Sequence, residues 1–179
     1  KPALPARPAF TARCRKCDAD LGSRADSDGR AAELDGGALY ECDRCVGPAA
    51  EPSPLADYRV LKLLGRGGMG TVSLVWHQTS CRLHALKRLL DLANPLMVQR
   101  FQREMQLMEG LAHRHVVRSL ATGVDPGGAP YLITEYVAGG DLESLAERSG
   151  GRLPWKQAAA FILEVLDGLA FLHSRSIVH

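Results

Sequence analysis

The stretch "LGRGGMGTV", residues 64–72, spaces three glycines as G-x-G-x-x-G, at Gly65, Gly67 and Gly70. Loops of this pattern let bare backbone approach phosphate groups, but the pattern alone is weak evidence for a ligand. In dinucleotide-binding folds these glycines open a helix. Here the next residues, 71–76 "TVSLVW", branch and alternate like a strand. The sequence therefore predicts a hairpin that lies over phosphates, with a glycine-rich turn without ligand as the alternative.

Other short runs rich in β-branched and aliphatic residues predict further strands. They are 58–64 "YRVLKLL", 82–90 "RLHALKRLL", 115–124 "HVVRSLATGV" and 129–137 "APYLITEYV". The last two are joined by "DPGG", which has the composition of a tight turn.

Two segments carry the helical period. Asn94 followed by Pro95 is typical of an N-cap and a first helical position. Four apolar residues then fall on one helical face: Phe101, Met105, Met108 and Ala112. Residues 154–173 are the clearest helix, because they carry a wide apolar stripe. The stripe consists of Ala158, Phe161, Ile162, Val165, Leu166, Leu169 and Leu172.

The composition limits the classes of function. A length of 179 residues suits one domain, or a small module plus part of a larger one. Apolar residues make up 46%, charged residues 23% and the net charge is +2, which is the balance of a soluble globular protein and not of a nucleic-acid binder. No apolar run reaches the roughly 18 residues of a membrane span, and no secretory signal opens the chain. We expect a cytoplasmic protein with no nucleic-acid partner, and Lys1 in place of Met suggests a fragment or a processed product.

Composition also divides the chain into segments. Residues 1–12 hold three prolines and no apolar period, which is typical of a flexible lead-in. Residues 13–46 hold four of the five cysteines and few large aliphatic residues, so this segment cannot build a core of its own. Residues 47–57 form a Pro/Ala linker. The periodic patterns occupy residues 58–179.

The cysteines of residues 13–46 form two pairs, Cys14-x-x-Cys17 and Cys42-x-x-Cys45, separated by 24 residues. Two such pairs can bring four thiolates to one metal ion in a tetrahedral shell, and zinc is the preferred occupant. Protein would fill all four positions, so we expect a structural site in a module that folds only with metal bound. Two disulfides are disfavoured by the missing secretory signal and by Cys81, which makes the number of cysteines odd. Four free thiols are the remaining alternative.

Two charged residues give the glycine loop a chemical context. Lys87 ends the strand stretch 84–87 "HALK", fifteen residues after Val72, and Glu104 lies seventeen residues further on, within the first predicted helix. A lysine that binds the α- and β-phosphates of a nucleotide must be held in place, and a helix-borne carboxylate can do so by ion pairing. Either residue alone would be a solvated surface charge. The ordered set favours a nucleotide site.

Together these motifs resemble the first half of a eukaryotic-type protein kinase domain, over residues 58–179. The family pattern G-x-G-x-x-G-x-V is met by the glycine loop and Val72, and its V-A-I-K strand by residues 84–87. Glu104 matches the family's helix glutamate and is followed by the usual Leu-x-His at residues 111–113. The Gly-Gly-Met-Gly form of the loop is similar to that of bacterial Ser/Thr kinases in particular.

The resemblance implies an α+β fold. A kinase-like small lobe, made of an antiparallel sheet and one helix, would be followed by the first helices of a large lobe and preceded by a zinc-ribbon-like module. It also implies catalytic roles for Lys87, which would pair with the phosphates, and Glu104, which would orient that lysine.

The stretch "YLITEYVAGGDLESL", residues 131–145, is similar to the hinge between kinase lobes. This match makes Thr134 the gatekeeper, and it gives the adenine edge the Glu135 carbonyl and the Val137 amide as partners. Asp141 would start a short helix near the ribose or the peptide substrate. The ATP-binding residues implied in full are Leu64, Gly65, Arg66, Gly67, Gly68, Met69, Gly70, Thr71, Val72, Ala85, Lys87, Thr134, Glu135, Val137 and Asp141.

The resemblance stops at His179, which aligns with the histidine of the family's H-R-D-L-x-x-x-N loop. The aspartate of that loop, and the asparagine and D-F-G aspartate that hold Mg²⁺, do not follow within the 179 residues. We expect the full-length protein to be a Ser/Thr kinase that moves the ATP γ-phosphoryl group to protein Ser/Thr hydroxyls. Its Mg²⁺ ligands would lie beyond the chain, and the 179 residues alone would be inactive.

Two alternatives stay open: a non-catalytic nucleotide-binding protein, and a protein whose zinc module binds a protein or nucleic-acid partner. The stripe on 154–173 would pack on the remainder of the large lobe, so the chain alone is expected to expose an apolar patch. A membrane tether after the catalytic domain, which bacterial kinases of this kind can carry, is compatible with the sequence.

Overall fold

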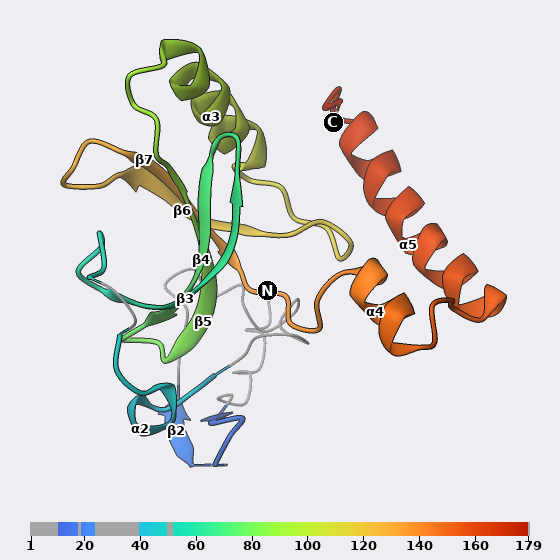
Figure 1. Cartoon of the computed structure of the whole chain (residues 1–179), viewed down its shortest axis with the longest axis horizontal. Helices are drawn as coiled ribbons and strands as arrows, with labels where there is room; N and C mark the ends of the chain where they lie inside the picture. The colour runs from blue at the N-terminus through green and yellow to red at the C-terminus, as the bar shows by residue number, and fades with distance from the viewer. Residues whose placement is uncertain (1–10, 18, 24–39, 50–51, 179) are drawn as a thin grey trace, which may run out of the picture.

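A computed structural model describes residues 11–17, 19–23, 40–49 and 52–178. The predicted lead-in therefore lies outside the described residues except at its end, as does part of the linker. Figure 1 shows a twisted sheet with one helix packed at its upper end, two helices to one side and a small N-terminal unit at the lower end.

The sheet has the strand order β3-β4-β5-β7-β6, and all neighbours are antiparallel. Its strands are β3 (Tyr58–Gly67), β4 (Gly70–His77), β5 (Arg82–Leu89), β6 (Ser119–Val124) and β7 (Pro130–Glu135). The crossover places β7 beside β5, so that Thr134 lies opposite Ala85 and Leu132 lies opposite Lys87. Residues more than forty positions apart in sequence thereby meet on one face.

Alternating side chains divide between the two faces of the sheet, as period 2 requires. On one face Val60, Val75, Leu86 and Ile133 form a buried cluster. On the other face Phe101 packs against Leu89 and Leu132 and is only 1% exposed. Burial of a side chain of this size contributes about 1.5–3 kcal/mol. This contact fixes the helix that carries Phe101 to the sheet.

That helix is α3 (Pro95–Met108), and it begins as predicted. Asn94 caps it, because its side-chain oxygen accepts hydrogen bonds from the Leu96 and Met97 amides. The predicted helical position of Ala112 is wrong: α3 ends at Met108, and Ala112 lies beyond it and is exposed. The chain leaves the helical conformation at Glu109, whose ψ is 129°, and Gly110 follows with a φ of 73°.

Three predicted strands are shorter than expected, the run 82–90 only by its last residue, since β5 ends at Leu89. The run 115–124 loses its first four residues, because His113 and Val116 form an isolated bridge and the chain turns before β6 begins at Ser119. The run 129–137 ends at Glu135, and the following segment contains Gly139 and Gly140 at positive φ. In the opposite sense, β3 continues three residues beyond its predicted end, to Gly67.

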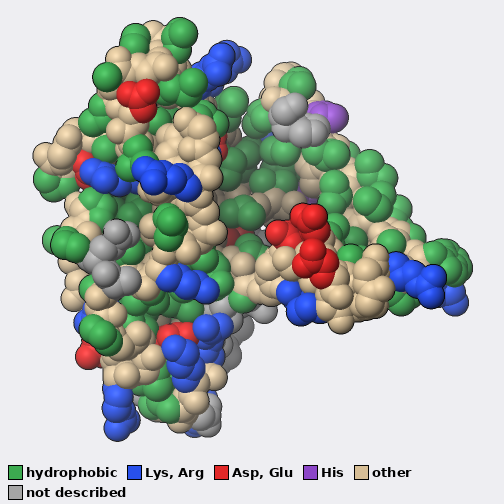
Figure 2. Space-filling view, in the orientation of Figure 1, with side chains coloured by type: hydrophobic (Ala, Val, Ile, Leu, Met, Phe, Trp, Pro, Cys, Tyr) green, Lys and Arg blue, Asp and Glu red, His purple; other side chains and the backbone are tan. Residues whose placement is uncertain are grey.

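The helices α4 (Leu142–Arg148) and α5 (Trp155–His173) follow that segment. Gly168 brings α5 close to the preceding turn, since a Cβ there would lie 2.7 Å from the His115 carbonyl oxygen. Much of the predicted apolar stripe faces solvent: the exposed fractions of Ile162, Val165 and Leu166 are 53%, 47% and 54%. Figure 2 shows apolar side chains gathered on the part of the molecule formed by α4 and α5, the α4–α5 limb. Among the described residues, no helix has the length and apolar character needed to span a membrane.

The N-terminal unit consists of β1 (Thr11–Arg13), β2 (Asp20–Ser23) and the single turn α2 (Asp43–Val46). β1 and β2 pair antiparallel. Tyr40, just before α2, forms a bridge with Arg82 at the start of β5. The unit therefore lies against the end of the sheet opposite α3 (Figure 1).

Candidate functional site

An ion pair between β5 and α3 lies at the centre of the site. Lys87 Nζ is 2.6 Å from Glu104 Oε1 and 2.7 Å from Oε2, so both carboxylate oxygens accept from one ammonium group. The Lys87 and Glu104 side chains are 25% and 34% exposed. An ion pair of this exposure contributes little to stability, at most about 1 kcal/mol. Its consequence is positional: the pair fixes the ammonium group on the face of the sheet that packs against α3, which is its inner face.

The glycine stretch forms a tight hairpin beside that ion pair. Gly67 lies opposite Gly70, and Val72 lies opposite Lys87 in the next strand pair. Gly70 is required by the fold, because its φ is 154° and a Cβ there would overlap the Arg88 carbonyl oxygen. A Cβ on Gly67 would meet nothing within 4 Å.

The remaining loop residues are placed by the same hairpin. Gly65 and Gly68, like Gly67, have open space where a Cβ would stand. Arg66 lies opposite Thr71 and is exposed, as is Leu64. Met69, at the tip, packs against the cluster beneath α3. The tip thus leans toward the helix that carries Glu104, while three glycines present bare backbone.

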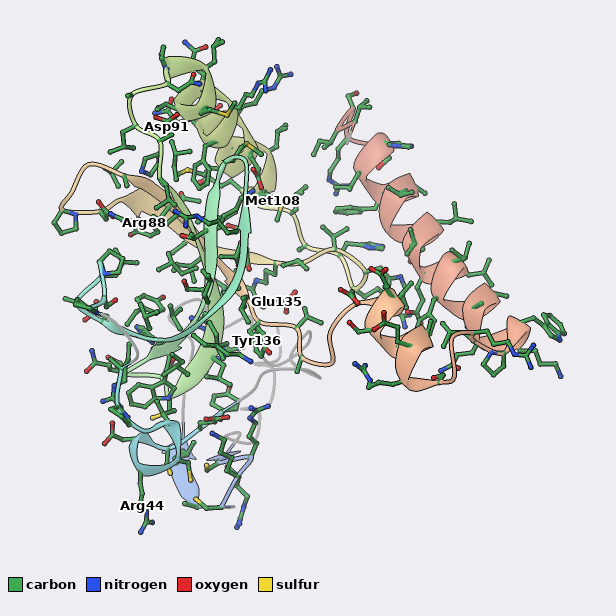
Figure 3. All side chains as sticks on the ribbon, viewed as in Figure 1. Arg44, Arg88, Asp91, Met108, Glu135 and Tyr136 are labelled. Atoms are coloured by element: carbon green, nitrogen blue, oxygen red, sulfur yellow. The ribbon has the colours of Figure 1, made fainter. Side chains whose placement is uncertain are left out.

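The predicted hinge leaves β7 toward α4, and Figure 3 labels Glu135 and Tyr136 on it. The Thr134 hydroxyl donates to the Glu135 carbonyl at 3.1 Å, and the Glu135 side chain accepts from the Arg118 amide at 2.8 Å. The Glu135 carbonyl keeps a second lone pair for another donor. Val137 is 63% exposed. The segment is therefore anchored at Glu135 and open at Val137.

Asp141 is the N-cap of α4, as expected for the residue that starts this helix. Its carboxylate accepts from the Ser144 amide at 2.7 Å. That backbone hydrogen bond lowers the pKa of Asp141, so the group is an anion at neutral pH.

A groove of about 350 Å³ borders the hinge and is lined in part by Val137, Leu142, Phe161 and Val165. Figure 2 shows the hollow between the sheet-bearing part and the α4–α5 limb. Lys87 and the glycine hairpin are not among its lining residues. The ion pair, the hairpin and the hinge, and not an enclosed cavity, therefore define the candidate nucleotide site.

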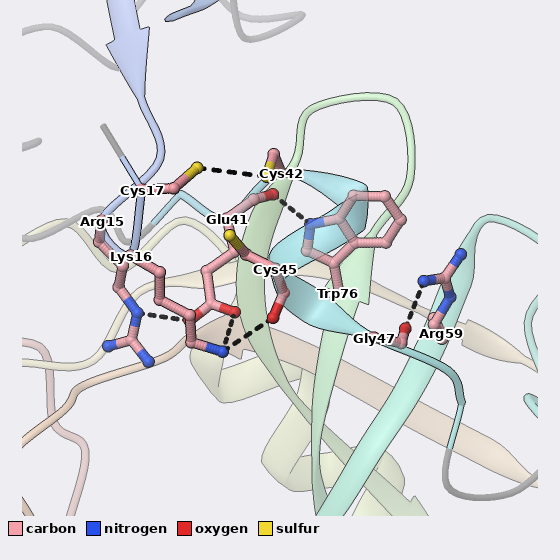
Figure 4. A network of polar contacts seen from close by, with 9 residues as sticks. All are labelled: Arg15, Lys16, Cys17, Glu41, Cys42, Cys45, Gly47, Arg59 and Trp76. Carbon is pink, nitrogen blue, oxygen red and sulfur yellow. Dashed lines mark hydrogen bonds and ion pairs between the residues drawn. The ribbon is translucent and has the colours of Figure 1, made fainter. Parts of the chain in front are cut away.

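A second constellation lies in the N-terminal unit, where the Sγ atoms of Cys14, Cys17, Cys42 and Cys45 all lie within 4.8 Å of one another. The Cys17 and Cys42 sulfurs are 3.7 Å apart (Figure 4). A tetrahedral shell with zinc–sulfur bonds of about 2.3 Å has sulfur–sulfur edges of about 3.8 Å. All five cysteines of the chain are among the described residues, and none of them is in a disulfide. The donor set and its spacing therefore fit one tetrahedral metal ion.

The thiols of this cluster influence one another's ionisation. Burial would raise the pKa of Cys14, but hydrogen bonds from backbone amides, that of Cys42 foremost, lower it to about 6. Hydrogen bonding with the thiols of Cys17 and Cys42 raises the pKa of Cys45 to about 12. One thiolate is thus favoured near neutral pH, and a divalent cation would favour the others.

The sequence patterns did not predict two polar clusters of the structure. Arg88 pairs with Asp125, which is 4% exposed and also accepts from the Ala129 amide. The composition of the "DPGG" turn indicated a turn here but not this partner in β5. In the second cluster His113 Nε2 and His115 Nδ1 lie 3.4 and 2.9 Å from one carboxylate oxygen of Asp167, which ties the turn before β6 to α5.

Comparison with known proteins places this geometry in a family. A family model described as the protein kinase domain matches residues 58–179. The chain is 36% identical over 125 residues to mitogen-activated protein kinase kinase 7 of Arabidopsis thaliana, covering 69% of this chain and 39% of that protein. It is 30% identical over 129 residues to serine/threonine-protein kinase Nek4 of Mus musculus, covering 70% of this chain and 16% of that protein.

The solved structures agree in fold. The chain matches the crystal structure of the Mycobacterium tuberculosis PknI kinase domain with a TM-score of 0.58 and 31% identity, covering 73% of this chain and 54% of that one. It thus spans about half the length of that domain and a smaller share of the curated relatives. Since the family model covers most of the chain and the five-stranded sheet with α3 reproduces the fold, the chain belongs to the protein kinase family.

Proposed function

We propose that residues 58–179 form the ATP-binding part of a serine/threonine protein kinase, which transfers the ATP γ-phosphoryl group to Ser/Thr hydroxyls of protein substrates. The observation that carries the proposal is the fixed ammonium group of Lys87, held by both oxygens of Glu104 beside the glycine hairpin. Neither residue needs this partner for stability, since the pair is partly exposed. A positioned cation next to bare backbone suits a polyphosphate.

Each part of the site has a role in this proposal. Gly65, Gly67 and Gly68 leave backbone amides accessible to phosphate oxygens, and Lys87 pairs with the α- and β-phosphates. Thr134 is the gatekeeper. The Glu135 carbonyl accepts from the adenine amino group and the Val137 amide donates to the ring.

Other residues would surround the nucleotide. Val72 and Ala85, on the inner face of the sheet, cover the base, and Leu64, Arg66, Met69, Gly70 and Thr71 complete the hairpin. Asp141, an anion at the start of α4, would contact a ribose hydroxyl or the peptide substrate. When bound, Mg²⁺ neutralises developing phosphate charge. The 179 residues contain neither the family's H-R-D-L-x-x-x-N loop nor its D-F-G motif, so they are expected to bind nucleotide without transferring phosphate.

The nucleotide proposal is tested by titrating the chain with an ATP analogue that carries a fluorescent ribose label. Saturable binding should be lost in Lys87→Ala and retained in Lys156→Ala, a matched control in α5, where Lys156 is exposed. Absence of binding by the unsubstituted chain, or equal binding by both variants, would contradict the proposal.

We also propose that Cys14, Cys17, Cys42 and Cys45 hold one structural Zn²⁺. The convergence of four sulfurs from two segments supports it, because disordered thiols would not meet at metal-binding distances. Elemental analysis should find one zinc per chain, and none in the double variant Cys42→Ser/Cys45→Ser. Cys81→Ser is the control, because Cys81 lies outside the cluster. Full zinc content in the double variant would contradict the assignment.

A partner-recruiting role for the cysteine module is the second candidate function. Deletion of residues 1–50 distinguishes this function from the first one. If recruitment of protein substrates is unchanged without these residues, the module is not the recruiting element.

A further inference from the structure

The cysteine unit and the kinase sheet share a polar junction at Glu41. Its amide donates to the Cys81 carbonyl at 3.0 Å, and its own carbonyl accepts from Trp76 Nε1 at 2.8 Å. The Glu41 carboxylate is 2% exposed and pairs with Arg15 and Lys16, which lie between the first two cysteines (Figure 4). One residue next to the ligand Cys42 therefore contacts both the cysteine cluster and the sheet.

Arg59 of β3 makes a second link. Its guanidinium donates to the Gly47 carbonyl at 2.6 Å and to the Asp43 carboxylate at 2.8 Å, which places both ends of α2 against the sheet. The same guanidinium lies 4.9 Å from the centre of the Trp76 ring. Trp76, 3% exposed, is thus enclosed between the cysteine unit and its own sheet. The helical turn that carries Cys45 is held by residues of β3 and β4.

An apolar cluster continues this junction toward the hinge. Leu74, Trp76, Cys81 and Leu83 form its buried part. Leu21 and Val46 of the cysteine unit pack against it, and so does Tyr136 of the hinge. Strand register places Trp76 opposite Leu83 and Leu74 opposite Ala85, on the face that carries Lys87 two residues further along. The cysteine unit and the hinge therefore support the same end of the inner face.

We propose that metal occupancy of the four-cysteine cluster regulates nucleotide affinity, through Glu41 and Trp76 to the hinge. The inference rests on the proposed nucleotide and zinc sites. With metal bound, the unit is ordered and completes the cluster under Tyr136, so the hinge is held in the conformation that binds adenine. Without metal the small, core-poor unit loses its order, and the hinge loses packing partners. By linkage, nucleotide binding then strengthens metal retention by the same factor.

The chain contains a reporter of this junction. It has two tryptophans, Trp76 at 3% exposure and Trp155 at 75%. In Trp155→Phe all tryptophan emission comes from Trp76. Removal of zinc with a zinc-selective chelator should shift this emission to longer wavelength, because the indole gains solvent when the unit undocks. Unshifted emission upon complete zinc loss would overturn the proposal.

The affinity test uses the full chain, zinc-loaded and zinc-stripped, with a fluorescent ATP analogue and Mg²⁺ present. We expect the dissociation constant to rise at least about fivefold on stripping, the lower end of ordinary coupling between sites. Equal dissociation constants would overturn the coupling and leave the nucleotide site intact. No binding by the zinc-loaded chain would overturn the proposed nucleotide site and the coupling with it.

A decoupling variant separates transmission from folding. Arg59→Met/Trp76→Phe removes the three side-chain hydrogen bonds that Arg59 and Trp76 donate to the cysteine unit and retains apolar bulk, without touching a cysteine. It should keep one zinc per chain and a cooperative melt, while the ratio of stripped to loaded dissociation constants falls toward one. Trp155→Phe is the control and should keep the full ratio. A variant that binds zinc and melts cooperatively but retains the wild-type ratio would refute transmission through this junction.

Discussion

The glycine hairpin gives a prediction in which two similar substitutions separate folding from binding. Gly67→Ala and Gly70→Ala alter positions three residues apart that lie opposite each other in the β3–β4 pair. At Gly70 the added methyl group would overlap the Arg88 carbonyl oxygen, and φ is 154°. Backbone strain of this kind costs about 1–3 kcal/mol. Overpacking adds about 1–3 kcal/mol.

At Gly67 neither cost arises, because φ is not positive and nothing lies within 4 Å of the added methyl group. Alanine there should leave the free energy of unfolding within about 1 kcal/mol of the original value. It should nevertheless weaken nucleotide binding, because the methyl group occupies space next to the backbone amides that approach phosphate.

The assay is urea unfolding, followed by titration with the fluorescent ATP analogue. We expect Gly70→Ala to lower the free energy of unfolding by about 2–6 kcal/mol, and Gly67→Ala to change affinity but not stability. A Gly70→Ala variant as stable as the original chain would refute the steric reasoning. A Gly67→Ala variant with unchanged affinity would refute the placement of phosphates beneath the hairpin.

Three further predictions concern stability. Phe101→Ala should lower the free energy of unfolding by about 3–5 kcal/mol, measured in urea, because the ring is fully enclosed between α3 and the sheet; a loss below 1 kcal/mol would contradict that packing. Asn94→Ala should cost about 1 kcal/mol through loss of the α3 cap, whereas Asn94→Asp should retain most of the stability. For Asp125, burial would raise the pKa, but the Ala129 amide and Arg88 lower it. The contribution of Asp125 to the free energy of unfolding is therefore present above the ordinary pKa of about 3.8 and is lost as the pH falls through the lower pKa of the folded state. Asp125→Asn should therefore make stability fall less steeply with decreasing pH in the acid range. An unchanged fall would count against the Arg88 pair.

Much of the fold was readable from local patterns. Period-2 runs indicated all five strands of the sheet, and Asn94-Pro95 located the start of α3. The end of α3 was missed although a signal was present, since Gly110 is a residue that commonly terminates helices. The extra strand length predicted at 115–118 had apolar content in its favour, but the bridge between His113 and Val116 overrides that preference.

The candidate site was likewise predicted only in part from the sequence. The spacing from the glycine loop to Lys87 and Glu104 brought these residues to attention, and the structure brings them together. The docking of the cysteine unit had no sequence signal, because Trp76 and Glu41 are far apart in the chain and their contact uses a backbone carbonyl, which any residue provides. Contacts of this kind depend on tertiary arrangement and not on local residue type.

The central claim is that Lys87 contacts the phosphates of a bound nucleotide, and lysine labelling tests it most directly. An acyl-phosphate derivative of ATP acylates the lysine nearest its phosphates, and the chain offers five lysines, at positions 1, 16, 62, 87 and 156. We expect mass spectrometry to find acylation at Lys87, suppressed by excess ATP, while the other four lysines show only labelling that ATP does not suppress. Labelling of Lys87 that is indifferent to ATP, or ATP-suppressed labelling at another lysine, would contradict the account.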